Sequence, residues 1–338
     1  RTSSTGSTST TMSGCMGTGK PLISILMAVY EPRMDWLRQQ LVSLNEQTYP
    51  NLRLYIRDDC SPTVPYEQIQ SCVQECITRF SYTITRNEKN LGSNDTFELL
   101  TQEADGELFA YCDQDDVWLP EKLTVLQEAM ERERAVLVCS DMYIIDGDGK
   151  QVADSITKVR RHHVFRSGTD LARGLLTSNF VTGCTMLIQS DAAKRAIPFC
   201  PYMVHDHYIA LCCAAEGMVY SSPKKTICYR IHGGNQTGLV VGVADKASYG
   251  KERIEPMLAR MQWLKDNFVC GAELEASIRD ALLWAQARDR NWHHRGGSGT
   301  VWKYRKFSPL SSMGEIFLKY APDGLFAKVM QWARRNRI

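Results

Sequence analysis

The fold of this 338-residue chain is decided by one stretch, Leu108-Phe109-Ala110-Tyr111-Cys112-Asp113-Gln114-Asp115-Asp116-Val117-Trp118-Leu119. Its first five residues are apolar and predict a buried strand. Three carboxylates follow within four positions, at Asp113, Asp115 and Asp116. Because carboxylates so crowded repel one another and raise one another's pKa, the end of this strand requires a cation or a set of hydrogen-bond donors.

A divalent metal ion is the simplest compensation for these carboxylates. Mg²⁺ and Mn²⁺ prefer oxygen ligands, and Mg²⁺ is usually held by carboxylates together with substrate phosphates. The pattern therefore predicts a substrate that carries a diphosphate. The alternative interpretation is a solvated acidic turn, in which Asp116 lies near the start of a helix that has Pro120 in its first turn.

Composition narrows the class of protein. A hydrophobic content of 43% supports a substantial core, arranged as one large α/β domain with a tail or as two smaller domains. The net charge of +2 gives no reason to expect nucleic acid as a partner. No apolar stretch reaches the ~18 residues of a transmembrane helix, and the twelve cysteines form no C-x-x-C pair. We therefore expect a cytoplasmic chain that is soluble or peripheral at the inner face of the membrane.

Strand patterns and helix patterns alternate after Pro21. Apolar runs predict strands at 22–29, 52–56, 82–85, 108–112, 136–143, 184–188 and 226–230. Helices are expected at 65–80, 94–104, 120–133, 171–176 and 209–215, and around Leu37, Leu41 and Leu44. Such repeated units imply an α/β fold with a doubly wound, mostly parallel sheet flanked by helices, whose ligands bind at the carboxyl ends of the strands.

The two ends of the chain differ in composition from the middle. Residues 1–20 are rich in Ser, Thr and Gly and are expected to be a cloning remnant or a disordered leader, which leaves 21–250 for the sheet. Residues 251–338 are predicted to form a basic helical extension, with eleven Lys or Arg against three Asp or Glu from Ala287 onward. The last helix places Leu325, Phe326, Val329, Met330 and Trp332 among basic residues. It could lie on an anionic membrane surface, or it could pack on the rest of the chain.

Several motifs stand in an order that carries a family resemblance. They are Ile23 to Tyr30, Gln47 to Leu52, Asp58-Asp59-Cys60-Ser61, Asn87-x-x-Asn90-Leu91-Gly92, Asp113-x-Asp115-Asp116 and His205-Asp206-His207. In this order they resemble the family-2 glycosyltransferases of the GT-A fold, over the region from Pro21 to Gly238. The segments 115–118 and 229–236 look most like bacterial rhamnosyltransferases of that family.

The resemblance implies transfer of a sugar from a nucleoside diphosphate donor to an acceptor hydroxyl, with inversion. Such chemistry requires a cation at the diphosphate, and the resemblance implies Mn²⁺ or Mg²⁺. Asp115 is the expected metal ligand, while Asp113 is expected near the ribose or in the metal shell. His232, in the glycine-rich loop after the last predicted strand, is a further candidate for the metal shell. For Asp116 the alternative is a cap on the following helix.

The same chemistry requires a base that takes the proton of the acceptor hydroxyl. Asp206 occupies the position of the catalytic base in the family that this sequence resembles. The alternative for Asp206 is a helix cap, because an acidic residue at the start of a helix is common. A zinc site at His205 and His207 is disfavoured, since two residues so spaced diverge at a helix start and no third ligand follows at a suitable spacing.

Donor recognition is expected at the ends of the first strands. The resemblance assigns nucleotide contacts to Tyr30, Glu31 and Asp59, with an acidic side chain placed against an N–H of the base. Asn90 and Asn94 match positions that line the donor pocket. Their alternative is a role in a turn or as a helix cap.

The acceptor is expected to be a glycan or a lipid-linked glycan. The resemblance implies transfer of L-rhamnose from dTDP-rhamnose to a bacterial surface or cell-wall polysaccharide, or to its lipid-linked precursor. Trp118 directly follows the carboxylates, and its ring could stack on an acceptor sugar or pack in the core.

Other functions remain open at this point. The same fold could use a UDP-hexose donor, or the chain could be a non-catalytic scaffold subunit that binds nucleotide sugars. A nucleotidyltransferase is disfavoured because the first strand ends in Tyr30-Glu31-Pro32 rather than in a glycine-rich loop that could hold a triphosphate. The oligomeric state is left open.

Overall fold

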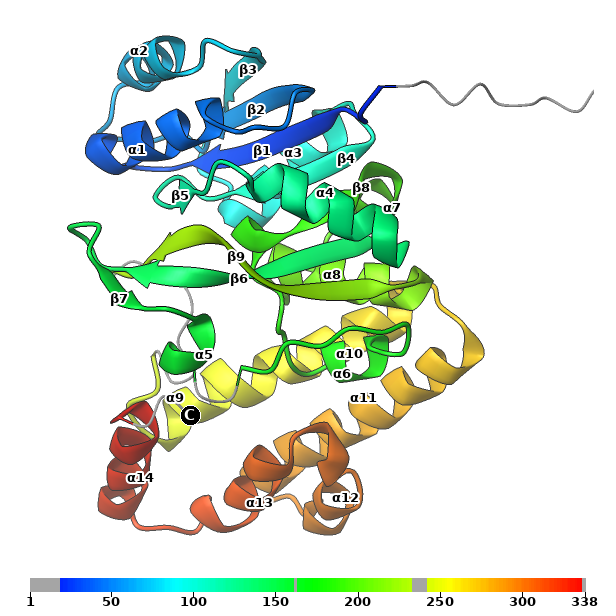
Figure 1. The fold of residues 1–338 in the computed structure, drawn as a ribbon. Coiled ribbons are helices and arrows are strands. Elements are labelled where there is room, and N and C mark those ends of the chain that lie inside the picture. Colours follow the sequence, from blue (N-terminus) through cyan, green and yellow to red (C-terminus); the bar gives the residue numbers. More distant parts are fainter. Residues whose placement is uncertain (1–18, 161–162, 233–241, 336–338) are drawn as a thin grey trace, which may run out of the picture.

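The computed structural model of this chain describes residues 19–160, 163–232 and 242–335 (Figure 1). Three predictions fall wholly or partly outside the described residues. They are most of the leader 1–20, the glycine-rich loop from Gly233 to Gly238, and the end of the last helix. Elsewhere the chain forms the expected α/β structure, with a curled sheet and a helical C-terminal region.

One mixed sheet organises the described part of the chain, in the order β3-β2-β1-β4-β8-β6-β9-β5, with β7 paired to β6. The strands are β1 (Ile23–Val29), β2 (Leu52–Asp58), β3 (Ser81–Arg86), β4 (Leu108–Cys112), β5 (Val117–Trp118), β6 (Leu137–Ile145), β7 (Gln151–Ala153), β8 (Leu187–Gln189) and β9 (Val219–Arg230). Strands β1 to β4 pair in parallel, as do β6 and β9. The short strand β8 runs antiparallel between β4 and β6. The prediction of a mostly parallel sheet is therefore confirmed.

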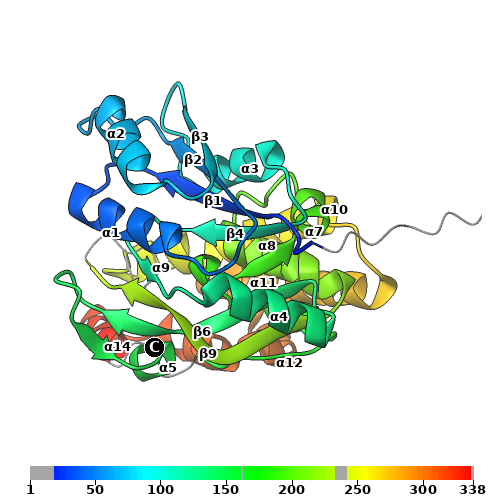
Figure 2. The ribbon, with the colours of Figure 1, turned by 45° about the horizontal axis from the view of Figure 1, so that its top comes forward.

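Helices cover both faces of this sheet because both faces of its strands are apolar (Figure 2). The helices are α1 (Met34–Asn45), α2 (Tyr66–Cys76), α3 (Ser93–Glu103), α4 (Lys122–Glu133), α5 (Ile156–Val159), α6 (Ala172–Leu175), α7 (Ser190–Arg195), α8 (His205–Glu216), α9 (Lys246–Tyr249), α10 (Glu255–Asn267), α11 (Ala272–Trp292), α12 (Ser298–Lys303), α13 (Pro309–Leu318) and α14 (Asp323–Arg335). In β1, Ile25 and Met27 belong to the cluster that includes α1, α2 and α4. Leu26 belongs to the cluster of α3, α7 and α8, as the alternation of side chains along a strand requires.

The order of the strands reverses next to β1, which predicts a ligand-binding crevice at the carboxyl ends of β1 and β4. The chain moves outward from β1 to β2 and β3, and then returns to β4 on the other side of β1. A reversal of this kind leaves a gap outside the carboxyl ends of the two central strands, where α/β proteins bind ligands. Tyr30 follows β1 and Asp113 follows β4, so the fold places these two predicted site residues at the gap.

The structure does not support the alternative in which Asp116 caps the following helix. Helix α4 starts at Lys122, and Val117–Trp118 form the short strand β5, which pairs with β9. Asp116 is fully buried, and its Oδ1 accepts a hydrogen bond from the backbone N–H of Arg230 at 2.9 Å. The carboxylate thus holds β9 to the loop rather than capping a helix.

Two predicted strands have different bounds in the structure. In the predicted strand at 184–188, the first residues belong to a short 3-10 helix, Gly183–Thr185, and only Leu187–Gln189 is extended. The predicted strand at 226–230 is the end of a longer one, β9, which begins at Val219. Lys224 and its neighbours are polar, so a prediction from apolar residues alone missed the first half of β9.

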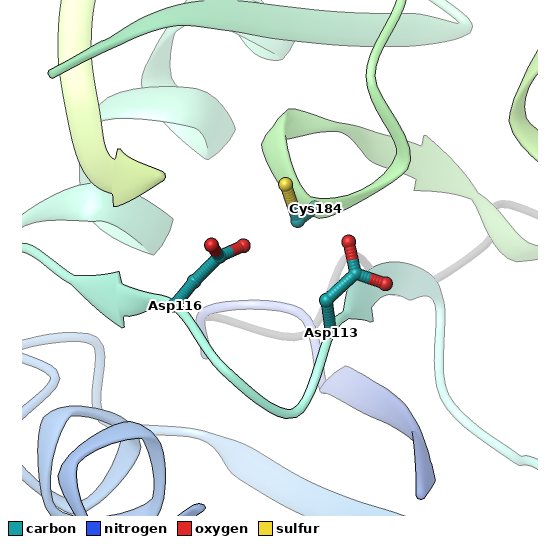
Figure 3. Close-up of side chains that lie close together, drawn as sticks. All are labelled: Asp113, Asp116 and Cys184. Atoms are coloured by element: carbon teal, nitrogen blue, oxygen red, sulfur yellow. The ribbon is translucent and has the colours of Figure 1, made fainter. Parts of the chain in front are cut away.

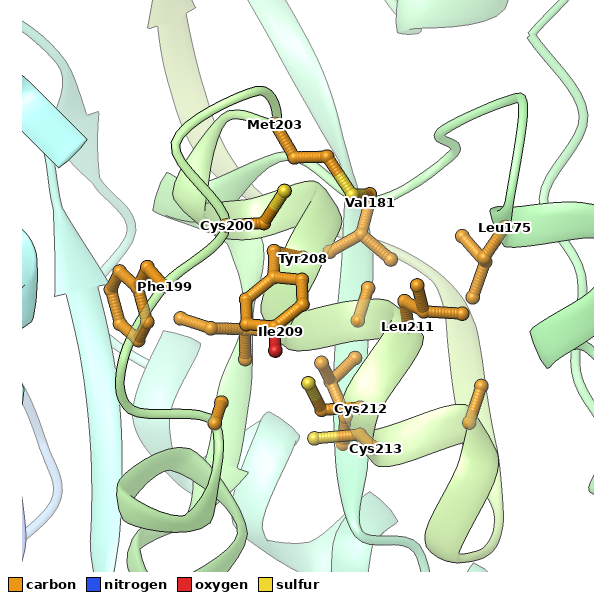
Figure 4. Packing of buried hydrophobic residues seen from close by; sticks show 14 of the residues in the cluster. Leu175, Val181, Phe199, Cys200, Met203, Tyr208, Ile209, Leu211, Cys212 and Cys213 are labelled. Atoms are coloured by element: carbon orange, nitrogen blue, oxygen red, sulfur yellow. The ribbon is translucent and has the colours of Figure 1, made fainter. Parts of the chain in front are cut away.

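The first C-terminal helices share a core with the sheet. Helices α10 and α11 belong to the same hydrophobic cluster as α8, whose apolar side chains are shown in Figure 4. The Tyr208 ring packs edge-on against Trp263, with ring centroids 5.5 Å apart. The division into domains at residue 250 stays a prediction, but α10 and α11 beyond it share a hydrophobic core with α8. Among the described residues, no helix combines the length and apolar character needed to cross a bilayer.

Helix α14 is anchored to its neighbours through one face. Phe326 and Met330 are buried in a small cluster with Val243, Ile254 and Trp292. Of the two possibilities that the sequence left open, these two residues follow the second, in which the helix packs on the rest of the chain. Other apolar side chains of α14 remain exposed, at Leu325 and Trp332.

A buried ion pair joins α11 to α13. Two guanidinium nitrogens of Arg288 donate to the carboxylate of Glu315, at 2.7 and 2.5 Å, and the hydroxyl of Tyr249 donates to the same group at 2.9 Å. The side chains of Arg288 and Glu315 are only 4% and 1% exposed. Loss of one partner would therefore leave an unpaired charge in the protein interior.

We expect Arg288→Leu to lower the free energy of unfolding by about 3–5 kcal/mol, because Glu315 loses its partner while it stays buried. The double variant Arg288→Leu/Glu315→Leu should recover most of that loss, since it leaves no unpaired charge. Urea unfolding measures both changes. The matched control is Arg279→Leu on the same helix, whose pair with Glu275 is exposed and should contribute about 0.5 kcal/mol. Equal effects at Arg288 and Arg279 would contradict this account.

Candidate active site

The loop after β4 is fixed to the end of β1. The side-chain amide of Gln114 accepts a hydrogen bond from the backbone N–H of Tyr30 at 2.8 Å and donates one to the Tyr30 carbonyl at 3.0 Å. Gln114 is the residue between the two predicted ligands Asp113 and Asp115, and sequence reasoning gave it no role. This pairing holds the acidic loop across the crevice at the edge of the sheet.

Two carboxylates of this loop and a thiol from another segment lie close together (Figure 3). Carboxylate oxygens of Asp113 and Asp116 and the Sγ atom of Cys184 all lie within 4.8 Å of one another. Surrounding protein atoms, followed by the charges of Asp115 and Asp206, raise the pKa of Asp113 to about 7. Burial, followed by the charges of Asp115 and Asp113, raises the pKa of Asp116 well above its ordinary value. The repulsion expected from the sequence is thus present.

The donor set of this cluster fits a hard divalent cation. The Oδ2 atom of Asp116 is buried and has no hydrogen-bond partner, so an oxygen is left with its charge uncompensated. Burial raises the pKa of the Cys184 thiol well above its ordinary value. Oxygen ligands without a thiolate are the set that Mg²⁺ and Mn²⁺ prefer. Asp113 and Asp116 are the carboxylates of this cluster that could hold such an ion, and the roles of Asp115 and His232 as metal ligands stay predictions.

A buried lysine lies beneath the cluster. The ammonium group of Lys122 donates a hydrogen bond to the Cys184 carbonyl and sits 3.3 Å from the centre of the Trp118 ring. Burial lowers the pKa of Lys122 to about 8. One such cation cannot balance three carboxylates, which again leaves the loop in need of positive charge. The sequence offered no signal for Lys122, since a lysine in the first turn of a helix is usually solvated.

Two of the predicted metal ligands meet directly. The Nε2 atom of His232 lies 2.6 Å from Oδ2 of Asp115. Arg230 supports this contact, because its Nε donates to the Asp115 carbonyl at 2.7 Å while its guanidinium reaches Gln39 Oε1 at 2.7 Å. Arg230 is 1% exposed and was missed as a functional residue, although it lies in the segment that carried the family resemblance. We infer that it positions the acidic loop.

The predicted base, Asp206, is held by a neighbouring loop. Helix α8 begins with Val204 as its N-cap residue, so Asp206 does not occupy the cap position. Its carboxylate accepts hydrogen bonds from the Gly183 backbone N–H at 3.0 Å and from the Asn179 amide at 3.1 Å. Burial raises the pKa of Asp206 to about 6. A carboxyl group with this pKa is ionised at neutral pH yet basic enough to accept a proton.

Gly183 allows the close approach of this loop to α8. A Cβ atom at Gly183 would lie 3.0 Å from Nε2 of His205 and 3.4 Å from Cβ of Asp206. Any larger residue would therefore push the loop away from the carboxylate. The next residue in the chain is Cys184, so two successive residues contact Asp206 and the acidic cluster.

The two histidines beside Asp206 serve packing. The His205 ring stacks on Phe97 with centroids 4.2 Å apart, while Nε2 of His207 lies 2.6 Å from the Leu175 carbonyl oxygen. Burial lowers the pKa of both rings to about 3, which keeps them neutral. The rings do not converge on a common point, as expected from their spacing.

Asp59 and Glu31, two residues predicted to contact the nucleotide, both hold neighbouring loops in place. The carboxylate of Asp59 accepts hydrogen bonds from Asn87 Nδ2 and from the backbone N–H groups of Leu91 and Gly92, each at 2.8 Å. The carboxylate of Glu31 accepts from the Thr63 N–H at 2.7 Å and from the Thr63 hydroxyl. Both carboxylates are thus engaged in structure, and direct contact with a nucleotide stays a prediction.

The remaining predicted residues differ in accessibility. Tyr30 is 44% exposed, and Asn90 is also exposed. The Asn94 amide donates to the Cys200 carbonyl at 3.3 Å, while its Oδ1 is buried without a partner. Trp118 is only 2% exposed and packs in the core beside α4, which favours the alternative of core packing over a stack on an acceptor sugar.

Comparison with known proteins identifies the family of this chain. The sequence model of glycosyl transferase family 2 matches residues 24–195, and the chain belongs to this family. An uncharacterised glycosyltransferase from Nostoc sp. is 26% identical over 220 residues, which cover 63% of this chain and 66% of the relative. WcaA of Escherichia coli, whose name assigns it to colanic acid biosynthesis, is 32% identical over 38% of this chain and 45% of its own length. The chain thus spans less than two thirds of these relatives.

Solved structures show the same fold at low sequence identity. S. aureus TarS (residues 1–349) in complex with UDP-GlcNAc superposes with a TM-score of 0.57 at 13% identity, over 93% of this chain and 92% of TarS. A mannosyltransferase from Pyrobaculum calidifontis, in complex with GDP-Man and Mn²⁺, superposes with a TM-score of 0.54 at 12% identity, over 93% and 85% of the two chains. The predicted GT-A fold is confirmed.

We expect Mn²⁺ to raise the melting temperature of this protein, because an ion bound to the folded acidic loop removes the repulsion among its carboxylates. At a concentration one hundred times the dissociation constant, binding contributes about 2.7 kcal/mol. Differential scanning fluorimetry with Mn²⁺ and with EDTA measures the shift. Asp115→Asn should lose most of it, whereas Asp148→Asn, in an exposed turn, should retain it. An equal shift in both variants would argue against metal at this loop.

Proposed function

We propose that this chain is a metal-dependent inverting glycosyltransferase that uses a nucleoside diphosphate sugar. The main support for the proposal is the turn at 183–185, which contacts both the proposed base and the proposed metal ligands. The Gly183 N–H donates to the carboxylate of Asp206, and Cys184 lies against Asp113 and Asp116. A basic carboxylate and a set of acidic ligands are therefore adjacent in one crevice.

The roles of the residues follow from their chemistry. Asp113, Asp115 and Asp116 would hold a divalent ion, which neutralises the diphosphate leaving group when bound. Asp206 accepts the proton of the acceptor hydroxyl while that oxygen attacks the anomeric carbon from the face opposite the diphosphate. Bonds from Gly183 and Asn179 orient the carboxylate of Asp206 for this transfer. Attack from the opposite face inverts the configuration of the sugar.

The donor we favour is dTDP-rhamnose. Its support is the resemblance of the segments 115–118 and 229–236 to bacterial rhamnosyltransferases. A UDP-hexose is the second candidate, because S. aureus TarS, which has the same fold, was solved with UDP-GlcNAc. Two of the predicted donor contacts are available for binding. The ring of Tyr30 is accessible, and the Oδ1 atom of Asn94 is buried without a hydrogen-bond partner.

The acceptor we favour is a hydroxyl of a bacterial surface polysaccharide or of its lipid-linked precursor. The name of WcaA refers to the biosynthesis of a polysaccharide, colanic acid. The other class of function, a non-catalytic subunit that binds nucleotide sugars, has no use for a base. The presence of both Asp115 and Asp206 therefore counts against it.

We expect Asp206→Asn to lower the rate of sugar transfer by about 10²–10⁴-fold while donor affinity stays within a few-fold of wild type, because the amide cannot accept the acceptor proton. Transfer is measured with radiolabelled donor, and affinity by calorimetry in the presence of Mn²⁺. The matched control is Asp95→Asn, an exposed acidic residue in the first turn of α3. Full transfer by Asp206→Asn would refute the role of base.

The acid limb of the wild-type pH profile tests the same role. Asp206 must be ionised to act, so kcat/KM should fall by about tenfold per pH unit as the pH drops below the raised pKa. With a pKa of about 6, the fall begins near that value rather than near the ordinary value for aspartate.

We expect one donor to be turned over, with dTDP-rhamnose ahead of the UDP-hexoses, and only with Mn²⁺ or Mg²⁺ present. A panel of nucleotide sugars, with and without metal, measures the hydrolysis of each donor. Asp115→Ala should abolish turnover because it removes the central ligand. Turnover of a UDP-hexose alone would replace rhamnose in the proposal, and binding of no donor under any condition would end it.

A further inference from the structure

Helix α13 buries polar side chains and exposes apolar ones, which is the reverse of an ordinary surface helix. The residues that it buries are polar, namely Ser312 and Glu315, and Lys319 just beyond its end is buried as well. Each contacts α11, where Trp284 Nε1 donates to Ser312 Oγ at 3.0 Å and Arg288 pairs with Glu315. A helix on a globular protein normally points its apolar stripe toward the core.

The apolar stripe of α13 points away from the protein. Leu310 is 70% exposed, Met313 45%, Phe317 71% and Tyr320, two residues past the helix, 69%. Their spacing of three, four and three residues places them on one side of the helix. We call these four residues the α13 face. In Figure 1 helix α13 lies at the end of the molecule remote from strands β1 to β3.

This orientation is fixed rather than accidental. The inner face is held by a buried ion pair and by hydrogen bonds from the Lys319 ammonium to the carbonyl and side-chain oxygens of Asn291, at 3.1 and 2.6 Å. Rotation of the helix would bury Leu310 and Phe317 only by exposing these groups and breaking their bonds. Contiguous exposed apolar surface on a protein marks an interaction site.

The charges around the α13 face select its partner. Lys303 and Arg305 are exposed on the neighbouring elements, and the guanidinium of Arg305 lies 4.5 Å from the Trp302 ring centre. Lys306 is exposed as well and pairs with Asp280 of α11 at 3.4 Å. Asp323 is the one exposed acidic residue described between 298 and 333, and it pairs with Lys246 at 3.3 Å. Apolar and aromatic side chains within a basic rim are typical of surfaces that bind anionic lipid.

A second copy of the chain suits this surface less well. A two-fold interface would place the α13 face of one copy against that of the other. The exposed cations Lys303 and Arg305 of the two copies would then lie close to each other, and like charges across an interface cost binding energy.

We propose that the α13 face docks on an anionic membrane surface, with Leu310, Met313 and Phe317 inserted at the boundary of the acyl chains. Tyr320 and Trp302 lie at headgroup depth, where aromatic rings with a polar atom are favoured. Lys303 and its basic neighbours contact the lipid phosphates. This assignment moves the membrane contact from α14, two of whose apolar residues are buried, to α13.

Co-sedimentation of the 338-residue chain with vesicles tests the proposal. We expect binding to vesicles of phosphatidylcholine and phosphatidylglycerol, and little binding to phosphatidylcholine alone. Leu310→Glu/Phe317→Glu should weaken binding by at least about tenfold, since it places charge in the acyl boundary. The matched control is Val269→Glu, which changes a residue that is 96% exposed in the connection of α10 to α11 and should bind as wild type does.

Each other outcome counts against the proposal. If wild type does not sediment with anionic vesicles, or if both variants bind equally, the α13 face is not a membrane site. If light scattering shows a dimer that Leu310→Glu/Phe317→Glu dissociates, the face is a protein interface instead. Circular dichroism confirms that each variant is folded. No donor or acceptor is present, so the result is independent of the proposed transferase activity.

Discussion

Repulsion among the carboxylates that follow β4 is the constraint on which the rest of the site depends. The chain answers it with contacts from distant segments, since Gln114 ties the loop to Tyr30, Arg230 reaches it from the end of β9, and Lys122 lies beneath it. These contacts join residues between 62 and 114 positions apart. The conformation of the acidic loop therefore depends on contacts with segments that are distant in the sequence. The carboxylates that it brings together are ligands of the kind that a divalent cation prefers.

Local patterns in the sequence predicted the scaffold of this site well. The apolar run at 108–112 indicated a central strand because a strand covered on both faces needs few polar residues, and β4 is buried along its length. The position of Asp206 at the start of a helix was also predictable, since α8 begins at His205. The alternative of Asp116 as a helix cap is not what the structure shows, and its partner, the backbone N–H of Arg230, was not predictable because it is remote in sequence.

The same limit explains the residues that sequence reasoning missed or assigned differently. Cys184 and Lys122 became visible only through contacts across the fold, and neither belongs to a short motif of polar residues. The contact of Glu31 with a nucleotide stays a prediction, and the hydrogen bond that its carboxylate accepts from the Thr63 N–H was not predictable from the local sequence. Trp118 likewise carries no local sign of burial. Its placement depends on β5 pairing with β9.

The adjacency of Gly183 and Cys184 has a mechanical consequence. Successive Cα atoms are about 3.8 Å apart across a trans peptide bond, so the group that anchors Asp206 and the residue beside Asp113 and Asp116 are joined by a single covalent unit. A displacement of this turn would therefore shift the surroundings of both carboxylate sites at once.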